Sequence, residues 1–299
     1  MSQQTTLASW VESTPYSDGR PGRARRKVVS LFDRHGLSLR PWQQRGFECL
    51  AINPKAGAVS CPGVTMRTAP MATIGQIRRA LPAPDEIEFL VATPPCRDLC
   101  AAGARWWKRK SERNPNFQSD AARFLWELYN LLNEELAQVP YTLLLPASPR
   151  IRSLFKQPDF AFSPHEYGGY LGPDAPHPLF PDTIPTQDRY TKKTFVFSGH
   201  HAQQPWKRPV VPVFTDVRLK SGIVKRISPV LASRSEREAR HVTPLGFSTA
   251  ICCVHAPAPP QSRPATHSDM LAGSSAPSAS SATSDSGDIR PPLASSSDP

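Results

Sequence analysis

One cysteine in this chain has a sequence context that suits covalent chemistry. Cys96 follows an apolar run, Ile87–Ala92, and a pair of prolines, Pro94 and Pro95. The run predicts a short buried strand, and the rigid Pro-Pro turn would present the Cys96 thiol at the carboxyl end of a sheet. In open α/β sheets this edge is where ligands bind. A thiol there can act as a nucleophile when its pKa falls below the usual value of about 8.5.

Cationic and aromatic residues follow Cys96 closely. Arg97, Arg105 and Lys108 are near enough in sequence to favour the thiolate form of Cys96. Positive charge interleaved with Trp106 and Trp107 also suits nucleic acid, through phosphate contacts and base stacking. The alternative is that the tryptophans pack this segment onto the core, and we expect one ring to do each. The nucleic-acid-binding residues expected are Arg97, Arg105, Lys108, Arg109, Lys192 and Lys193, although the two later lysines could equally sit at a solvated strand end.

The elements that must position Cys96 begin with a βαβ unit. Residues 28–32 and 47–52 are apolar, β-branched runs that predict strands, and residues 38–46 look helical, with Ser38 as N-cap and Pro41 in the first turn. A loop bearing Gly36 lies above the first strand. This arrangement receives nucleotide-like cofactors, although a single glycine is weak support because any turn can require positive φ.

The remaining pattern continues the alternation of helices and strands. Apolar residues recur at intervals of three and four from 117 to 139, which predicts a helix whose stripe packs in the core. The other expected elements are loops over 55–69 and 171–188, helices over 71–81 and 235–250 with an interruption at 243–247, and strands over 141–145, 160–163 and 190–197. The fold class expected is α/β, a doubly wound Rossmann-like sheet with a small irregular C-terminal recognition region.

Composition suggests three regions. Residues 1–27 predict a flexible basic arm, or simply a solubilising leader. Residues 28–255 predict the folded domain, with a DNA-recognition part at about 150–232. The Ala-, Ser- and Pro-rich segment 256–299 lacks the large apolar residues needed to fold, so we expect a disordered tail.

The charge and the cysteines narrow the class of partner and compartment. The 299 residues carry a net charge of +11, which suits either a polyanionic partner or merely a soluble surface. The six cysteines form no repeated CxxC pair, so a closed zinc site is not expected. Neither a signal peptide nor a membrane span is expected, and reduced thiols in the cytoplasm are the default.

Several short motifs occur in an order that resembles a known family. They are Leu31-Phe-Asp-x-x-Gly36, Pro94-Pro-Cys96 with Gly103-Ala-Arg-Trp-Trp107, Lys156-Gln-Pro-Asp159, His165-Glu-Tyr-Gly-Gly169, Tyr190-Thr-Lys-Lys-Thr194 and Thr243-Pro-x-Gly-Phe247. Together they resemble the small DNA cytosine-5 methyltransferases of phages and prophages, over about residues 28 to 250. A Pro-Cys pair alone is common, whereas the ordered series is specific.

The resemblance implies a methyltransferase with S-adenosylmethionine as cofactor and double-stranded DNA as substrate, in the cytoplasm of a bacterial host and as a monomer without a metal. Cys96 would attack carbon 6 of a cytosine held outside the duplex, so that carbon 5 accepts the methyl group. The loop after the first strand would lie under the methionine part, and Asn53 would face the ribose. The cofactor-binding residues implied are Leu31, Phe32, Asp33, Gly36, Asn53 and Pro94.

Two departures from the family pattern affect the expected activity. The family usually has an acid where this chain has Asn53. It also has a Glu-Asn motif where this chain reads Leu143-Leu-Leu-Pro-Ala-Ser-Pro149. The missing glutamate assists nucleophilic attack, and such acid–base assistance contributes about 10²–10⁴-fold in rate. Glu166 is the candidate substitute, and Arg150 keeps a position that is basic in the family.

Three hypotheses follow. The first is a DNA cytosine-5 methyltransferase with Cys96, Arg150 and Glu166 as catalytic residues. The second is a catalytically degenerate protein of the same fold that binds DNA. The third is another pyrimidine modification that uses Cys96 for covalent activation. The plain alternative for Cys96 is a buried structural thiol.

Overall fold

The structure is a computed structural model that describes residues 26–55, 60–200, 202–218, 221–233 and 237–256. The structural statements below concern these residues. Nearly all of the expected basic arm (1–27) and of the expected disordered tail (256–299) lies outside them.

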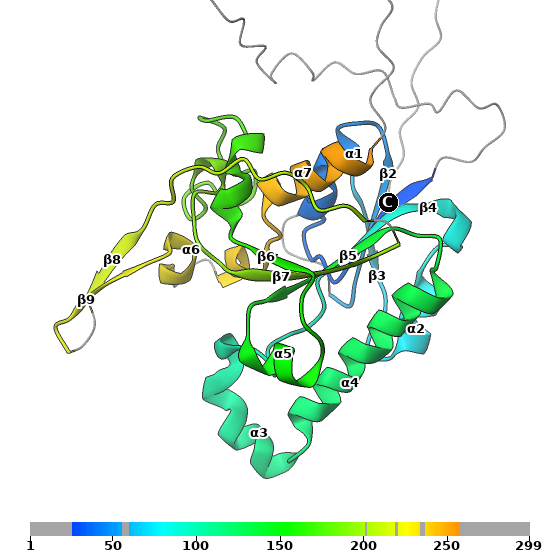
Figure 1. Ribbon diagram of the computed structural model, residues 1–299, viewed down its shortest axis with the longest axis horizontal. Helices are drawn as coiled ribbons and strands as arrows, with labels where there is room; N and C mark the ends of the chain where they lie inside the picture. The colour runs from blue at the N-terminus through cyan, green and yellow to red at the C-terminus, as the bar shows by residue number, and fades with distance from the viewer. Residues whose placement is uncertain (1–25, 56–59, 201, 219–220, 234–236, 257–299) are drawn as a thin grey trace, which may run out of the picture. The chain divides into compact units, whose positions relative to one another are not determined.

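A seven-stranded sheet forms the centre of the fold (Figure 1). Its order is β3-β2-β1-β4-β5-β7-β6, and its neighbours pair in parallel except at β7, which runs antiparallel to both β5 and β6. The central strands are short apolar runs buried on both faces, as parallel sheets covered by helices require. The strands are β1 Lys27–Leu31, β2 Glu48–Asn53, β3 Thr65–Thr68, β4 Ile87–Ala92, β5 Tyr141–Pro146, β6 Phe160–Phe162 and β7 Thr194–Gly199.

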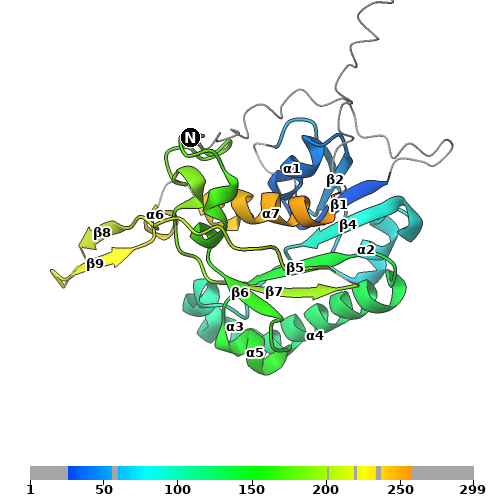
Figure 2. The same cartoon turned by 45° about the horizontal axis from the view of Figure 1, so that its top comes forward.

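Helices cover both faces of the sheet (Figure 2). On one face lie α2 (Ile74–Ala80), α4 (Phe117–Asn130) and α5 (Pro149–Leu154), and on the other lie α1 (Arg40–Gln43) and α7 (Leu245–His255). Each face has its own apolar cluster. The protein is therefore an α/β protein with a mostly parallel mixed sheet, compatible with a Rossmann-like fold.

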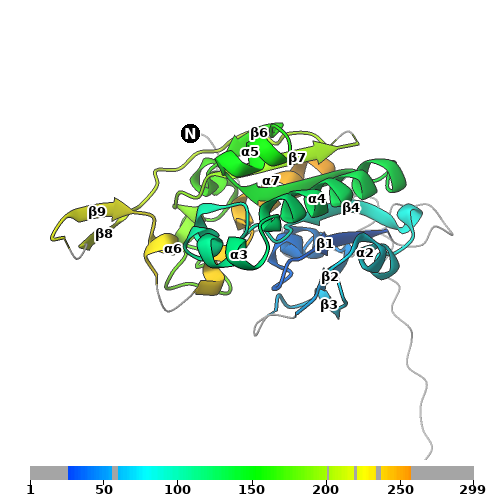
Figure 3. The same cartoon turned by 90° about the horizontal axis from the view of Figure 1, so that it is seen from below.

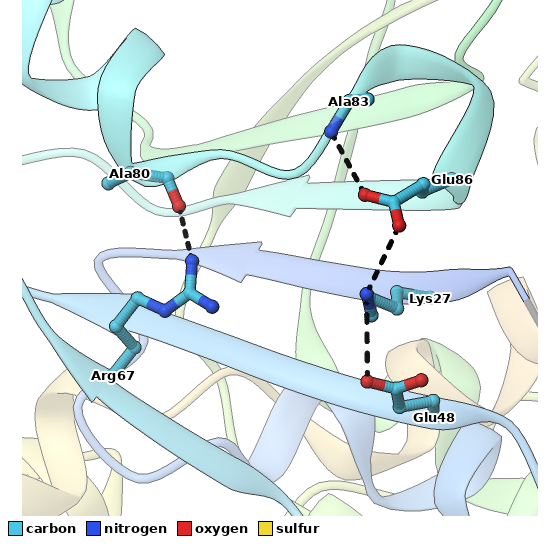
Figure 4. A network of polar contacts seen from close by, with 6 residues as sticks. All are labelled: Lys27, Glu48, Arg67, Ala80, Ala83 and Glu86. Atoms are coloured by element: carbon cyan, nitrogen blue, oxygen red, sulfur yellow. Dashed lines mark hydrogen bonds and ion pairs between the residues drawn. The ribbon is translucent and has the colours of Figure 1, made fainter.

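Ion pairs fasten the amino ends of the central strands (Figure 4). Lys27 Nζ on β1 lies 3.8 Å from a Glu48 carboxylate oxygen on β2 and 3.5 Å from one of Glu86, just before β4. Arg67 on β3 donates to the carbonyl of Ala80 at 2.8 Å, which ties the edge strand to the end of α2. The ion pairs lie at the amino ends of β1, β2 and β4, so they leave the carboxyl edge to the site.

The helix expected over 117–139 packs in the core as predicted, but its α-helical part ends earlier than predicted. Leu125, Leu128 and Leu132 are fully buried, so the apolar stripe does pack in the core. The α-helix ends at Asn130, and the chain continues as a π-helical turn, Leu131–Glu135. The extra residue in that turn lets Leu131 and Leu132 both face the core before Pro140.

Several sequence-based boundaries are wrong. The loop expected over 55–69 contains β3, whose polar residues pair only with β2 at the sheet edge. Ser38 is not an N-cap: it lies inside a 3₁₀ turn, η2 (Leu37–Leu39), and its hydroxyl donates to Asp33. The helix expected over 235–250 with an interruption at 243–247 is broken near that point, into a 3₁₀ helix, η8 (Arg237–His241), and α7, which starts after Pro244; its end is wrong, because α7 extends to His255.

Residues 199–232 contain elements that periodicity did not reveal. Strands β8 (Thr215–Arg218) and β9 (Val224–Ile227) form an antiparallel ribbon that stands apart from the main sheet (Figures 1 and 3). A short helix, α6 (Pro229–Ala232), follows it. The other short elements are η3 (Pro84–Glu86), η4 (Ala101–Trp106), α3 (Trp107–Arg113), η6 (Pro164–Tyr170) and η7 (Thr186–Asp188).

Within the described ranges, no helix combines the length and the apolar character that crossing a bilayer requires.

Candidate catalytic and nucleic-acid site

The chain turns sharply where β1 ends. Phe32 has φ 65°, and its N–H donates to the carbonyl of Ile52 on β2 at 2.8 Å. Its ring is buried and meets Phe124 of α4 edge-on, with centroids 6.1 Å apart. A positive φ is rare for a bulky residue and persists only where the surroundings enforce it, which is common in ligand sites.

Asp33 shapes the loop that follows. One carboxylate oxygen accepts from the N–H groups of His35 at 3.1 Å and Gly36 at 2.9 Å. The other accepts from the N–H of Ser38 at 3.0 Å and from its hydroxyl at 2.6 Å. Both oxygens are therefore engaged inside the loop, so Asp33 fixes the loop, and its predicted role in binding a cofactor would be indirect.

Gly36 is required by this loop. Its φ is 67°, and a Cβ atom there would lie 2.9 Å from Cγ1 of Val64. Both the left-handed backbone and the close packing disfavour a side chain at this position.

The other residues expected to hold the cofactor lie on the same edge. Asn53 ends β2, is buried, and its side-chain oxygen accepts from the N–H of Lys55 at 3.0 Å. Leu31 is fully buried in the core, and its carbonyl accepts from the N–H of Thr93 at 3.0 Å. Pro94 is also buried. Leu31 therefore supports the edge through its backbone and packing, while Asn53 places an amide there.

Cys96 is partly exposed directly beyond β4, as the sequence predicts, and a second thiol lies beside it. The Sγ atoms of Cys96 and Cys100 are 3.9 Å apart, and Cys100 is buried. The hydrogen bond with Cys100 and burial raise the pKa of Cys96 well above its usual value. The hydrogen bond with Cys96, aided by the backbone N–H groups of Ala102 and Gly103, lowers the pKa of Cys100 to about 6.

This corrects the expectation that neighbouring cations would make Cys96 the thiolate. Arg97 acts on Cys100 instead, and the cation that lowers the pKa of Cys96 is Lys192, which is far away in sequence. The two thiols therefore titrate as a pair, and the backbone N–H groups around Cys100 favour the negative charge there.

Sheet topology explains how Lys192 reaches the thiols. Because β7 runs antiparallel to β5, its first residue, Thr194, pairs with Pro146 at the carboxyl end of β5. Lys192 Nζ donates to the carbonyl of Arg240 at 2.7 Å. Burial lowers the pKa of Lys192, while the nearby Cys96, Asp188 and Cys100 counteract this. Lys192 therefore acts on the two thiols, whereas Lys193 is exposed and its nucleic-acid role stays a prediction.

Ser148 joins the loop after β5 to the segment from Cys96 to Gly103, which we call the thiol loop. The sequence did not indicate this role of Ser148. Its hydroxyl donates to the carbonyl of Leu99, which lies between the two cysteines, at 2.5 Å. The same oxygen accepts from the N–H of Arg150 at 3.2 Å and caps α5. Arg150 itself is exposed on the first turn of that helix.

Glu166 is engaged away from Cys96. It lies in η6, where it accepts from the N–H of Ser163 at 2.6 Å and pairs with Lys207 at 2.7 Å. Burial raises the pKa of Glu166, but the bonds from Lys207 and Ser163 outweigh it, so the pKa is lower than usual. Among the interactions of the described residues, none connects Glu166 to Cys96.

A cationic cavity of about 280 Å³ opens beside the thiol loop. Trp106 is 43% exposed in it, and the guanidinium of Arg105 lies 5.0 Å from the centre of that ring. Trp107 is more buried than Trp106, and the expected stacking of one ring on nucleic acid stays a prediction. Lys108 is exposed nearby on α3. The cavity is lined by Arg97, Trp106, Arg109, Lys110 and Arg113, and Lys110 also pairs with Asp98.

Gly103 holds the thiol loop against this cavity. A Cβ atom there would lie 1.8 Å from the carbonyl oxygen of Arg97. The glycine of the Gly-Ala-Arg-Trp-Trp motif is therefore needed for the loop to fold back on itself, which brings Cys100 and Arg97 together.

A further segment reaches this edge from the C-terminal part of the fold. Glu238 on η8 pairs with Arg34 at 3.1 Å and lies 3.6 Å from the His35 ring nitrogen. Burial lowers the pKa of His241, and the charges of Lys192, Arg34 and Arg97 add to this. η8 therefore packs beside the loop after β1 and the thiol loop, which the sequence did not indicate.

No protein-family model matches this chain, and no curated protein sequence matches it. In the described part of the chain, no cluster of three or more His, Cys, Asp or Glu side chains is arranged to hold a metal ion.

Proposed function

We propose that this chain is a DNA cytosine-5 methyltransferase that uses S-adenosylmethionine and Cys96 as its nucleophile. The observation that carries the proposal is the position of Cys96. Cys96 is a partly exposed residue just beyond β4, on the same sheet edge as the Gly36 loop, and the charge of Lys192 acts on its thiol.

The strand order of the sheet supports S-adenosylmethionine as the cofactor. An order of 3-2-1-4-5-7-6, with strand 7 reversed between strands 5 and 6, is the order of the S-adenosylmethionine-dependent methyltransferase fold to which the motif resemblance points. In that fold the ligand lies beyond the carboxyl ends of the strands.

The residues at this edge fit the cofactor in type. Phe32 turns the chain, Gly36 admits the tight loop, and Asn53 supplies an amide suited to a ribose hydroxyl. S-adenosylmethionine, where bound, supplies the methyl group. The chain's part is to fix the loop through Asp33 and to close the edge with Pro94.

Cys96 must lose its proton to attack carbon 6 of cytosine, and the structure offers an acceptor. The Cys100 thiolate lies 3.9 Å away, at hydrogen-bonding distance for sulfur, and can take that proton. The Lys192 charge favours the Cys96 anion as it forms. This pair acts on the nucleophile, whereas the motif glutamate of the family acts on the cytosine ring.

Two cationic surfaces fit DNA. The cavity lined by Arg97, Arg109 and Arg113 suits backbone phosphate, with Trp106 available for stacking. The β8–β9 ribbon lies within the 150–232 region expected to recognise DNA, and it exposes Arg218. A two-stranded ribbon fits the major groove.

One observation favours the second candidate, a degenerate methyltransferase-fold protein that binds DNA without catalysis. Among the described residues, the charges acting on Cys96 are those of Cys100 and Lys192, and neither is a carboxylate. Glu166 is paired with Lys207 instead. The assistance normally given by the motif glutamate is then absent, which would lower the rate by about 10²–10⁴-fold.

Transfer of a labelled methyl group to a cytosine-containing duplex tests the proposal. We expect transfer by the wild type, none by Cys96→Ser, and unchanged transfer by Cys253→Ser, which alters an exposed cysteine on α7. Equal transfer by Cys96→Ser would refute the role of Cys96. Salt-sensitive duplex binding without transfer would instead establish the degenerate protein, and mass analysis of the nucleosides would identify any other modification.

A further inference from the structure

We propose that Cys96 and Cys100 form a redox-active dithiol that low-molecular-weight disulfides convert to an intramolecular disulfide. This site goes beyond methyl transfer, and its existence does not depend on that function.

The sulfur atoms of Cys96 and Cys100 are close enough to form a disulfide bond after a small movement. The two sulfurs are 3.9 Å apart, so they need to approach by about 2 Å to reach a disulfide bond length. The segment between them is a turn, in which the N–H of Leu99 donates to the carbonyl of Cys96 at 2.9 Å, and it belongs to no helix or strand. Side-chain rotation with a small adjustment of the turn can therefore close the bond.

A metal site does not account for this pair. Two thiols supply only half of the ligands of a tetrahedral zinc site. Within the described ranges, no third His, Cys, Asp or Glu joins them in a metal-binding cluster. The charges acting on the pair from side chains other than the two cysteines include those of Lys192 and Arg97, both cations, which favour a thiolate and oppose a bound metal cation.

Access and ionisation give the two thiols different roles. Cys96 is a partly exposed residue and Cys100 is 3% exposed, so an external disulfide approaches Cys96 first. The lowered pKa of Cys100 keeps a thiolate next to Cys96 at neutral pH, ready to accept a proton or to attack. Cys96 is thus the attacking thiol and Cys100 the resolving thiol.

The exchange balances in two steps. Cys96, passing its proton to Cys100, attacks a disulfide RSSR; a Cys96–SR bond forms, the S–S bond of RSSR breaks, and one RS⁻ leaves and takes a proton. Cys100, after losing the proton to solvent, attacks the Cys96 sulfur and releases the second RS⁻, which also takes a proton. The protein dithiol is oxidised, and one RSSR is reduced to two RSH.

Two residues outside the Cys96–Cys100 pair hold the loop in the conformation that brings the two thiols together. Ser148 bonds the Leu99 carbonyl between the cysteines, and Gly103 permits the close approach of the Arg97 backbone. If the proposed function holds, oxidation also removes the nucleophile and stops methyl transfer.

The test uses the full chain equilibrated in buffers of reduced and oxidised glutathione, followed by alkylation and peptide mass analysis. In oxidising buffer we expect the peptide carrying both cysteines to lose two hydrogens and to resist alkylation. We expect Cys100→Ser to stop at a mixed disulfide of glutathione on Cys96, and Cys96→Ser to form neither product. Cys253→Ser serves as the matched control and should behave as the wild type.

Two results would overturn the proposal. One is a wild type whose Cys96 and Cys100 both remain alkylatable in every buffer. The other is a wild type that accumulates the mixed disulfide to the same extent as Cys100→Ser, which would show that Cys100 does not resolve it. Both results are read by mass from proteins that need not methylate DNA, so they are distinct from a failure of the proposed function.

Discussion

At the scale of single residues, partners distant in sequence decide the chemistry of this site. The pKa of Cys96 is set by Cys100, by burial and by Lys192, rather than by the arginines that follow it. The pKa of Lys192 in turn depends on Asp188, whose charge counteracts the effect of burial. A cysteine after a buried strand could be predicted from the sequence, and the structure places it there. Its thiol partner could not, because an i, i+4 spacing in a non-helical loop carries no signal.

Asp188 is a buried acid whose titration should be visible in stability. It is 1% exposed, and burial raises its pKa to about 7, although the N–H groups of Gly246 and Leu245 and the charge of Lys192 lower it. The folded state holds the proton more tightly than the unfolded chain, whose Asp pKa is about 3.9. The stabilising contribution is therefore complete below about pH 4 and is lost as the pH rises through about 7.

We expect Asp188→Asn to flatten this dependence, because the amide oxygen can still accept from the N–H of Gly246, which donates to the wild-type carboxyl at 2.8 Å. Between pH 5 and pH 8 the wild type should lose about 2 kcal/mol more unfolding free energy than the variant. Urea unfolding at both pH values measures this, with Asp216→Asn on the exposed β8 as the control. Parallel pH profiles for wild type and Asp188→Asn would contradict a buried, protonated Asp188.

At the scale of elements, whether a strand could be predicted from the sequence depended on how far its residues are buried. Strand β4 has the predicted bounds because its apolar run is buried on both faces. Strands β3, β8 and β9 were missed because their residues are mostly exposed and polar, so neither alternation nor an apolar run marks them. The break between η8 and α7 was predicted because Pro244 interrupts the helical pattern, but the 3₁₀ character of η8 was not.

Two glycines, Gly36 in the loop after β1 and Gly222 on the ribbon, allow a matched test of what holds that loop in place. Gly36 and Gly222 both have positive φ, 67° and 82°, but an added Cβ meets Val64 at 2.9 Å only at Gly36 and finds nothing within 4 Å at Gly222. Alanine at either position should cost about 1–2 kcal/mol for the left-handed backbone.

Gly36→Ala should cost about 1–3 kcal/mol more than Gly222→Ala, because the loop must shift away from Val64. It should also weaken S-adenosylmethionine binding, whereas Gly222→Ala on the ribbon should not. Thermal unfolding and calorimetric titration with the cofactor measure the two effects. Equal destabilisation by the two alanines would show that the Val64 contact does not hold the loop.

At the scale of the whole molecule, the net charge of +11 becomes informative only once it is located. The cationic cavity lies beside the thiol loop, while the β8–β9 ribbon stands apart from the main sheet (Figure 3). Phosphate contacts bind all sequences alike, whereas a ribbon in the major groove reads base edges. The two surfaces should therefore contribute differently to DNA binding.

We expect alanine at Arg109 or Arg113 to weaken binding equally for all duplex sequences and to reduce the slope of log K against log salt by about 0.9 for each phosphate that is no longer neutralised. Alanine at Arg218 on the ribbon should instead change the preference among sequences. Arg79→Ala, on α2 outside the cavity, removes the same charge and should leave both slope and preference unchanged. Fluorescence titrations of labelled duplexes at several salt concentrations measure these quantities. An equal reduction of the slope by Arg79→Ala would mean that the protein binds DNA through its overall charge and not through the cavity beside Cys96.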